Sequence, residues 1–287
     1  SIIYSNQKLL YDALYHAASA TLNELAKDAK YLGANIGYIC ILHTWGSAMN
    51  YHPHIHTIVL GGGLDDENKW KETGGKFFLP YGVISKVFRG KYLDELKSLW
   101  NDSKLKFHGT AEKYQNSYRF KELLDKCYEK NWVTYCKETF NGAQSVINYL
   151  GKYTHRIAIS NHRIKSMTDT TVTYVVKDYK NEGCWKEKTI SGEEFIRRFM
   201  MHVPPKRFVR IRHYGLLSCR NKRKKITHCR NLLGCKKYIS TLKNLNAVEM
   251  IKVLYHIDVC KCSSCGGNMV SPRKDKYSSS FRAHMRC

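Results

Sequence analysis

Apolar residues recur with two periods along the first part of the chain, and each period predicts one kind of element. Between residues 6 and 31 the spacing is that of an amphipathic helix, carried by Leu9, Leu10, Leu14, Ala18, Leu22 and Leu25. Residues 36–46 are a β-rich run, and residues 51–60 read as a second strand that ends at the glycines 61–63. The short connection through Gly46 predicts that these two strands form an antiparallel hairpin.

The rest of the chain mixes both patterns. Helical spacing is found at 82–102, 111–130, 142–155 and 192–203, and strand-like runs at 132–140, 156–164, 171–179 and 184–191. This order predicts an α+β fold with a largely antiparallel sheet. Pro204 and Pro205 end the last helix, and a basic segment begins at Lys206. We therefore expect one domain over residues 1–203 and a basic C-terminal region over 204–287.

Charge indicates the partner. Lys and Arg outnumber Asp and Glu by 48 to 24, which gives a formal net charge of +24. Such a balance favours nucleic acid, and no long apolar run predicts a membrane span. Residues 206–225 interleave cations with aromatic rings, as in surfaces that bind phosphates and stack bases, although a solvated basic loop would look the same. The candidate DNA contacts are Arg210, Arg212, Tyr214, Arg220 and Lys222.

The chain has eleven cysteines, most of them isolated, and no signal peptide, which predicts a reduced, cytoplasmic setting. Cys262 and Cys265 have the spacing of a zinc half-site, and Gly266 permits its tight turn. A structural zinc needs four ligands, so other residues would have to complete the site; otherwise the pair is inert. The candidates to complete it are Cys260, His284 and Cys287.

The segment "YHPHIHTIVLGGG" at 51–63 holds three histidines at alternating positions. In a strand, imidazoles two residues apart lie roughly 6.6 Å apart on one face and can converge on one divalent metal. Pro53 cannot donate to a ladder, which predicts that it opens the strand and leaves His54 and His56 as the regular pair. The third ligand is then His52 or His43, and a hairpin turning near 48 or 49 places His43 almost opposite residue 54 or 55.

Two phenols form a second candidate site. Tyr149 and Tyr153 are four residues apart in a predicted helix, so both lie on one face with a rise of roughly 6 Å between them. A phenol is both a usable nucleophile and a usable leaving group. Attack on a phosphodiester would store the broken bond as a phosphotyrosine, whereas an aromatic stripe packed on a core is the simpler alternative.

A histidine strand followed downstream by a tyrosine helix resembles the HUH single-strand nucleases. More closely, "LHTWG", "HPHIHTIVLGGGL", "YLGKYTHRIAISNHRI" and "RFVRIRHYGLL" are similar to motifs of the insertion sequence 91 family of two-tyrosine rolling-circle transposases, in the same order. The resemblance implies an HUH-type nuclease domain over 1–203, with His54 and His56 as metal ligands and Tyr149 and Tyr153 as paired nucleophiles. That family usually has a cysteine-rich segment ahead of the first helix, so we expect an N-terminally truncated chain.

By the same resemblance, the protein is a transposase that nicks and rejoins single-stranded DNA at the ends of a mobile element in a prokaryotic cytoplasm. It would use Mg²⁺ or Mn²⁺, with a structural Zn²⁺ as a further candidate. Three alternatives stay open: a plasmid replication initiator or relaxase, a decayed transposase that only binds DNA, and a zinc hydrolase built on His52, His54 and His56.

Overall fold

The computed structural model describes residues 1–74, 79–136, 143–154, 158–178, 183–220, 222–235, 242 and 244–269. The chain divides into two compact units, Ser1–Cys235 and Lys236–Cys287. The predicted boundary at 203/204 falls inside the first unit. The reason is a strand after Pro205, β7 (Ile211–Gly215), which pairs with the central strand of the main sheet. The segment that was expected to begin a basic extension therefore contributes a strand to the main sheet.

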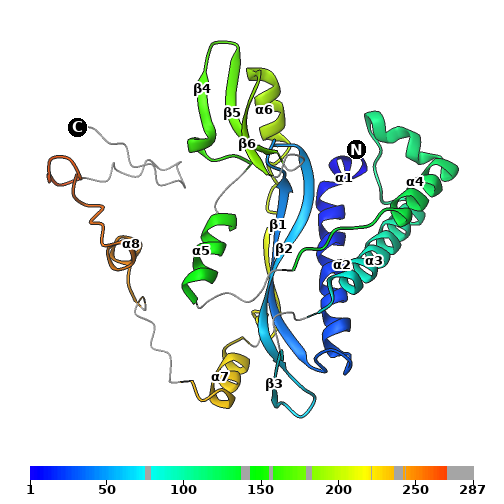
Figure 1. The fold of residues 1–287 in the computed structure, drawn as a ribbon, viewed down its shortest axis with the longest axis horizontal. Coiled ribbons are helices and arrows are strands. Elements are labelled where there is room, and N and C mark those ends of the chain that lie inside the picture. Colours follow the sequence, from blue (N-terminus) through cyan, green and yellow to red (C-terminus); the bar gives the residue numbers. More distant parts are fainter. Residues whose placement is uncertain are drawn as a thin grey trace. The chain divides into compact units, whose positions relative to one another are not determined.

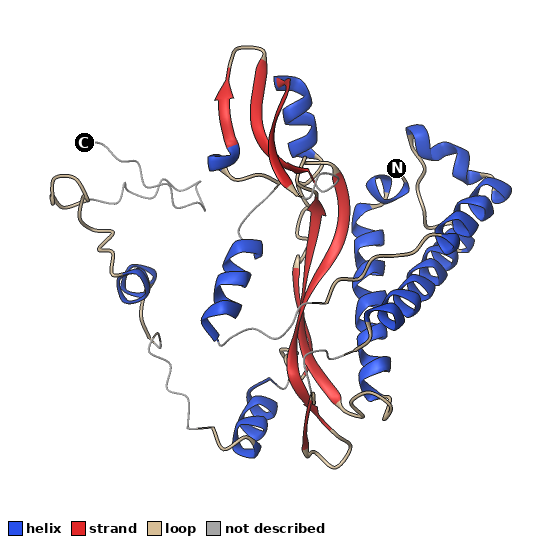
Figure 2. Ribbon diagram, in the orientation of Figure 1, coloured by secondary structure: helices blue, strands red, loops and turns tan. Residues whose placement is uncertain are grey.

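The main sheet has the order β3-β2-β1-β7 and is antiparallel throughout (Figures 1 and 2). Strands β1 (Asn35–Trp45) and β2 (Tyr51–Leu64) form the predicted hairpin, and β3 (Trp70–Glu72) pairs with the end of β2. The glycines 61–63 continue β2 instead of ending it. Pro53 is the third residue of β2, tolerated because the outer edge of β2 is unpaired there: β3 joins only at Gly62–Leu64.

One face of the sheet is covered by the long helix α2 (Gln7–Lys27), which follows the short α1 (Ile2–Ser5). Tyr38, Cys40 and Leu42 of β1 are buried against it, and Tyr11 and Tyr15 of α2 are also buried. α3 (Tyr81–Asn101) packs on α2, and α4 (Ser117–Glu129), preceded by a 3₁₀ turn at Gly109–Gln115, completes that side. Residues 131–136 are not a strand, contrary to expectation, and 137–140 lie outside the described residues.

The opposite face carries the alternate residues. In the β1–β2 ladder His43 pairs with His54 and Ile41 with His56, so these side chains share the face away from α2. α5 (Ala143–Thr154) and α7 (Lys222–Leu232) lie on this side of the sheet (Figure 1). We call it the histidine face.

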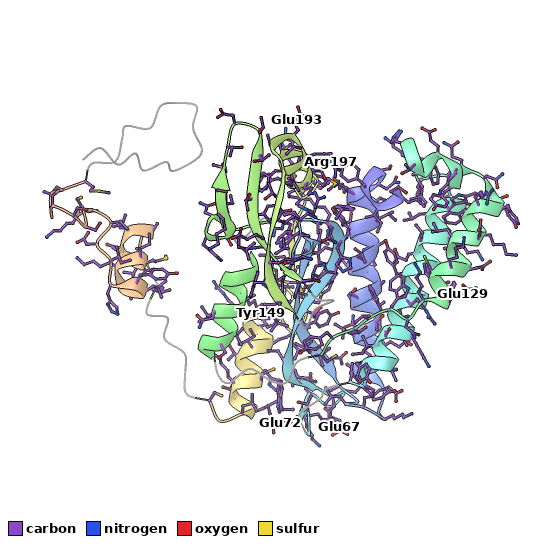
Figure 3. All side chains as sticks on the ribbon, turned by 45° about the horizontal axis from the view of Figure 1, so that its top comes forward. Glu67, Glu72, Glu129, Tyr149, Glu193 and Arg197 are labelled. Carbon is purple, nitrogen blue, oxygen red and sulfur yellow. The ribbon has the colours of Figure 1, made fainter. Side chains whose placement is uncertain are left out.

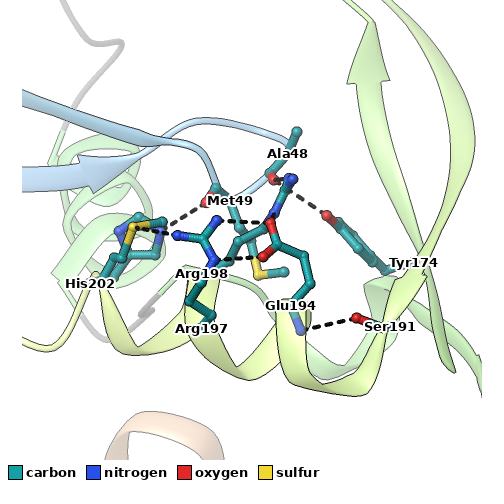
Figure 4. A network of polar contacts seen from close by, with 9 residues as sticks. Ala48, Met49, Tyr174, Ser191, Glu194, Arg197, Arg198 and His202 are labelled. Carbon is teal, nitrogen blue, oxygen red and sulfur yellow. Dashed lines mark hydrogen bonds and ion pairs between the residues drawn. The ribbon is translucent and has the colours of Figure 1, made fainter. Parts of the chain in front are cut away.

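A second sheet, β4-β5-β6, is formed by Ile164–Met167, Thr171–Asp178 and Cys184–Ser191, followed by α6 (Gly192–Met200). Of the strand expected at 156–164, residues 156–157 lie outside the described residues, residues 161–163 form a 3₁₀ turn, and β4 begins at Ile164. Side chains of the second sheet, α6 and the residues after α6 hold the turn of the β1–β2 hairpin (Figure 4). Arg198 donates to the carbonyl of Ala48 at 3.0 Å, and His202 donates to that of Met49 at 3.1 Å.

The second compact unit holds α8 (Ala247–Tyr255), which begins with a capping box between Asn246 and Glu249. None of the helices in the described ranges is long and apolar enough to cross a membrane.

Candidate metal and tyrosine site

Three imidazoles meet where β1 and β2 pair. His43 of β1 lies directly opposite His54 of β2, and His56 lies two residues farther along β2 on the same face. One ligand atom of each lies within 4.8 Å of the others. His43 is buried, whereas His54 and His56 are half-buried. The antiparallel register therefore builds a three-imidazole cluster from two strands.

Hydrogen bonds fix which nitrogen of His54 faces the cluster. Its Nδ1 lies 2.7 Å from the carbonyl oxygen of His52 and donates to it, because a carbonyl can only accept. Its Nε2 is then an acceptor and lies 3.1 Å from Nε2 of His56. Burial lowers the pKa of His54, and burial followed by the charge of His54 lowers the pKa of His56 to about 4. Both rings are therefore neutral at pH 7, the form in which imidazole binds a metal.

α5 brings a phenol to this cluster. Tyr149 projects from α5 (Figure 3), and its hydroxyl lies 2.8 Å from Nδ1 of His56, with the ring centroids 6.2 Å apart. His56 thus presents one nitrogen to His54 and the other to Tyr149. Tyr153 lies one turn farther along α5, and its side chain is outside the described residues. Its predicted role stays a prediction.

The ring of His43 is held by a neighbour that the sequence reasoning did not select. Trp45 stacks on His43 with centroids 4.6 Å apart, and the guanidinium of Arg210 lies 5.7 Å from the Trp45 ring centre. Burial lowers the pKa of Arg210. The signal was present in "LHTW", because residues two apart on a strand share a face.

His52, the third ligand in our first assignment, is not part of the cluster. Among the described residues one group of three could hold a metal, and its third member is His43. The side chain of His52 is exposed, and its contribution to the site is the backbone carbonyl that orients His54. Cross-strand partners approach to about 5 Å between Cβ atoms, closer than two residues along one strand, which favours His43. The structure thus supports His43, the alternative that the predicted hairpin offered, as the third member of the cluster.

The predicted DNA contacts separate into two groups. Arg212 and Tyr214 of β7 pair with Cys40 and Tyr38, which places them on the α2 face and not on the histidine face. Arg212 forms an ion pair with Asp12 of α2, and Tyr214 stacks on Tyr38 at 5.2 Å.

Arg212 also lies 4.0 Å from the ring centre of Tyr15. The charge of Arg212 and the ring of Tyr214 therefore stabilise the core. We had expected these two groups to contact phosphates and bases, but both are engaged within the fold. Arg220 and Lys222 are exposed and remain candidates.

The cysteine pair lies in the second unit within a tight turn. The backbone N–H of Gly266 donates to the carbonyl of Cys262, and Gly266 has a φ of +70°, as the sequence led us to expect of this glycine. In the described part of this unit, Cys260, Cys262 and Cys265 do not form a group of three converging ligand atoms. His284 and Cys287 lie outside the described residues, so the zinc assignment stays a prediction.

A largely antiparallel sheet with flanking helices and a histidine cluster on one face defines an HUH-endonuclease-like fold. The family model described as "Putative transposase" (Y2_Tnp) matches residues 37–225. The chain is 40% identical, over 82% of its length, to "Putative transposase y4qJ" of Sinorhizobium fredii. It is 27% identical, over 93% of its length, to "Transposase for insertion sequence element IS801" of Pseudomonas savastanoi pv. phaseolicola.

The chain belongs to this Y2_Tnp transposase family, which is insertion sequence 91-like. It spans 59% and 63% of the lengths of these two relatives. No solved structure gives a significant match.

Proposed function

We propose that the chain is the nuclease and strand-transferase part of a transposase, which cuts and rejoins single-stranded DNA through 5′-phosphotyrosine intermediates during rolling-circle transposition. The observation that carries this proposal is the contact between Tyr149 and His56, because it joins a nucleophile to a three-imidazole cluster. Membership of a transposase family supports DNA as the substrate.

The residues fit a divalent cation. Three neutral imidazoles offer nitrogen donors, and His54 has the carbonyl partner on its other nitrogen that is typical of metal-bound histidine. An ion bound by His43, His54 and His56 would neutralise charge on the oxygens of the scissile phosphate. Of the two expected ions, nitrogen donors favour Mn²⁺ over Mg²⁺, which prefers oxygen ligands.

The protein groups supply the chemistry of the exchange. His56 orients the hydroxyl of Tyr149 through the hydrogen bond between its Nδ1 and that hydroxyl. The phenol oxygen attacks the phosphorus and loses its proton, and the bond from phosphorus to the 3′ oxygen breaks. This leaves a 3′-hydroxyl and a 5′-phosphotyrosine. The reverse attack by a 3′-hydroxyl restores a phosphodiester and frees the tyrosine, so no nucleotide hydrolysis is needed. A second phenol at Tyr153 would allow a second strand to be cut while the first is held.

The alternatives make different predictions. A replication initiator or relaxase shares the cut and differs only in the fate of the product, whereas a decayed remnant binds DNA without cutting it. A zinc hydrolase would cut without a covalent link to tyrosine. The separating test incubates the protein with end-labelled single-stranded DNA and Mn²⁺ and follows both nicking and the covalent protein–DNA adduct, with His56→Ala as the matched inactive control. Nicking without an adduct would indicate the zinc hydrolase, and neither product would indicate the decayed remnant. Equal nicking by the parent and His56→Ala would overturn the assignment of the cluster.

The wider setting follows from the family. The DNA bound would be the single strand at the ends of the mobile element, in the cytoplasm of a prokaryotic cell. Because the curated relatives are longer than this chain, recognition of the ends is assigned to the whole transposase.

A further inference from the structure

α7 is a helix of cations without an acidic residue. Its sequence over Lys222–Leu232 is KRKKITHCRNL, and Lys222, Arg223 and Lys224 are exposed, while Lys225 is half-buried. Within the described part of the chain, none of these four pairs with a carboxylate at ion-pair distance, although Glu and Asp partners are common elsewhere on the surface. Four neighbouring positive charges repel one another, and an external polyanion would relieve that repulsion.

The helix is fixed to the histidine face. Cys229 of α7 is buried with Leu64 of β2 and Leu216, and Leu60 packs against the same cluster. His54, His56, Ile58 and Leu60 alternate along β2 and share that face. Leu60 is four residues from His56, which corresponds to about 13 Å along the strand. α7 therefore lies beside the row of alternate β2 residues that leads from His56 to Leu60, away from the metal and tyrosine site.

The first residue of α7, Lys222, lies near His213 of β7. Burial lowers the pKa of His213, and the positive charge of nearby Lys222 lowers it further. His213 of β7 pairs with Ile39 of β1, which pairs with Ile58 of β2, and Ile58 lies two residues from His56. His213 is therefore separated from His56 by two strand spacings across the sheet and by two residues along β2. Strand geometry makes this separation roughly 12 Å. A DNA backbone that leaves the site along this face would meet Lys222 first.

Farther along, a cleft of about 610 Å³ continues the basic surface. Lys224 and Lys225 of α7 line it together with Lys27 of α2. Asp65 is also in the lining, but its carboxylate accepts hydrogen bonds from the backbone N–H groups of Glu67 and Lys69. The cleft thus offers three lysines. The Asp65 carboxylate in its lining already accepts hydrogen bonds from the backbone of its own turn.

We propose that Lys222, Lys224 and Lys225 form a clamp for the phosphates of the single strand that flanks the cleaved bond. This inference rests on the proposed function, which identifies the bound molecule as single-stranded DNA. The inference adds the surface that guides this DNA. The clamp takes the role that the sequence assigned to Arg212 and Tyr214, whose side chains are engaged within the fold. It is sequence-independent, because contacts to phosphates carry no direct sequence information.

The test is binding of oligothymidylates to the full chain in EDTA, which prevents cleavage. The clamp variant replaces Lys222, Lys224 and Lys225 with alanine, a change that favours the helix. The matched control replaces Lys86, Lys97 and Lys121, which are exposed on α3 and α4 on the other side of the sheet. Dissociation constants are measured from low to physiological salt for a short strand of about 4 nucleotides and a long one of about 16, the range of common single-strand sites.

For the long strand, the clamp variant should lose roughly tenfold or more in affinity at about 0.15 M salt, and its slope of log K against log salt should fall by about 2, or about 0.7 for each lost phosphate contact. The affinity of the clamp variant for the short strand, and the affinity of the control variant for both strands, should change little. An unchanged slope, or an equal loss of affinity on both lengths, would overturn the clamp. If the parent forms no adduct, the proposed function fails, while the binding series still tests the surface.

Discussion

His43 and His54 lie directly opposite one another in the β1–β2 ladder, and their rings meet edge to face with centroids 5.6 Å apart. Two strands thus contribute to one cluster, and the hairpin turn sets the distance between their histidines. The turn is itself held by segments that flank the second sheet, because Ser47, Ala48 and Met49 accept hydrogen bonds from Arg163 of the 3₁₀ turn, Arg198 of α6 and His202 after α6. These segments therefore have a structural link to the histidine cluster.

We predict that His43 matters for metal binding and that the His52 ring does not. His43→Phe keeps a ring to stack on Trp45 but has no ligand nitrogen, so it should lower cleavage at limiting Mn²⁺ by about 100-fold or more. His52→Ala keeps the backbone carbonyl that orients His54 and should stay within about threefold of the parent. Cleavage rates across a Mn²⁺ titration measure both. The reverse ranking would return the third ligand position to His52.

The donor set predicts a preference between the two expected ions. Three imidazole nitrogens bind Mn²⁺ more tightly than Mg²⁺, so half-maximal cleavage should require at least about tenfold less Mn²⁺. His54→Asp introduces an oxygen ligand and should narrow that ratio. A parent enzyme that works equally well at the same low concentration of either ion would contradict the all-nitrogen site.

Arg212 should contribute to stability. It pairs with Asp12 and lies against Tyr15, with the pair partly exposed, so Arg212→Ala should lower the free energy of unfolding by about 2–4 kcal/mol. Arg223→Ala on the exposed face of α7 should change it by less than about 0.5 kcal/mol. Urea denaturation measures both. Equal stability of the two variants would mean that the Asp12 pair is not formed in solution.

His202 predicts a dependence of stability on pH. It is buried, donates from Nε2 to Met49, and accepts at Nδ1 from the Thr44 hydroxyl, and burial lowers its pKa below the ordinary 6.5. The unfolded chain therefore takes up a proton first as the pH falls, so the stability contributed by neutral His202 is full above about pH 6.5 and is lost below it.

The comparison variant is His202→Gln, which does not titrate. His54, His56 and His213 have pKa values shifted in the same direction, so both proteins should lose stability in acid, and the parent should lose more. Unfolding free energies in EDTA at about pH 7.5 and about pH 5 give the difference, which is limited to about 1.4 kcal/mol per pH unit for one proton. A gap between parent and variant that is the same at both pH values would contradict a neutral His202.

Local periodicity predicted the helix at α2 and the β1–β2 hairpin, because both elements bury one regular face. The hairpin register also offered His43, although the first assignment favoured His52. The face of β7 could not be deduced from the density of positive charge. We expected a basic segment here and no strand, and only the pairing of β7 with β1 shows that Arg212 and Tyr214 lie against α2.

Contacts between distant segments were beyond local patterns. The approach of Tyr149 to His56 depends on where α5 lies, and the segment before Ile164 alternates like a strand yet forms a 3₁₀ turn. In the structure, Arg163 of that turn donates to the carbonyls of Ser47 and Val175, a tertiary role that competes with strand pairing.

The central claim is that the histidine cluster and Tyr149 form one site for single-strand cleavage, and mapping the covalent adduct tests it most directly. The protein is incubated with single-stranded DNA and Mn²⁺, denatured and digested, and the peptide that carries the nucleotide is identified by mass spectrometry. The account predicts that the parent carries a 5′-phosphotyrosine on Tyr149. Tyr149→Phe should form no adduct at the first cut, and His56→Ala should form no adduct at all. For a two-tyrosine enzyme, the Tyr149→Phe, Tyr153→Phe double variant forms no adduct, and each single variant fails to transpose in cells. Cleaved DNA without any tyrosine adduct, or an adduct that forms equally well in His56→Ala, would contradict the account.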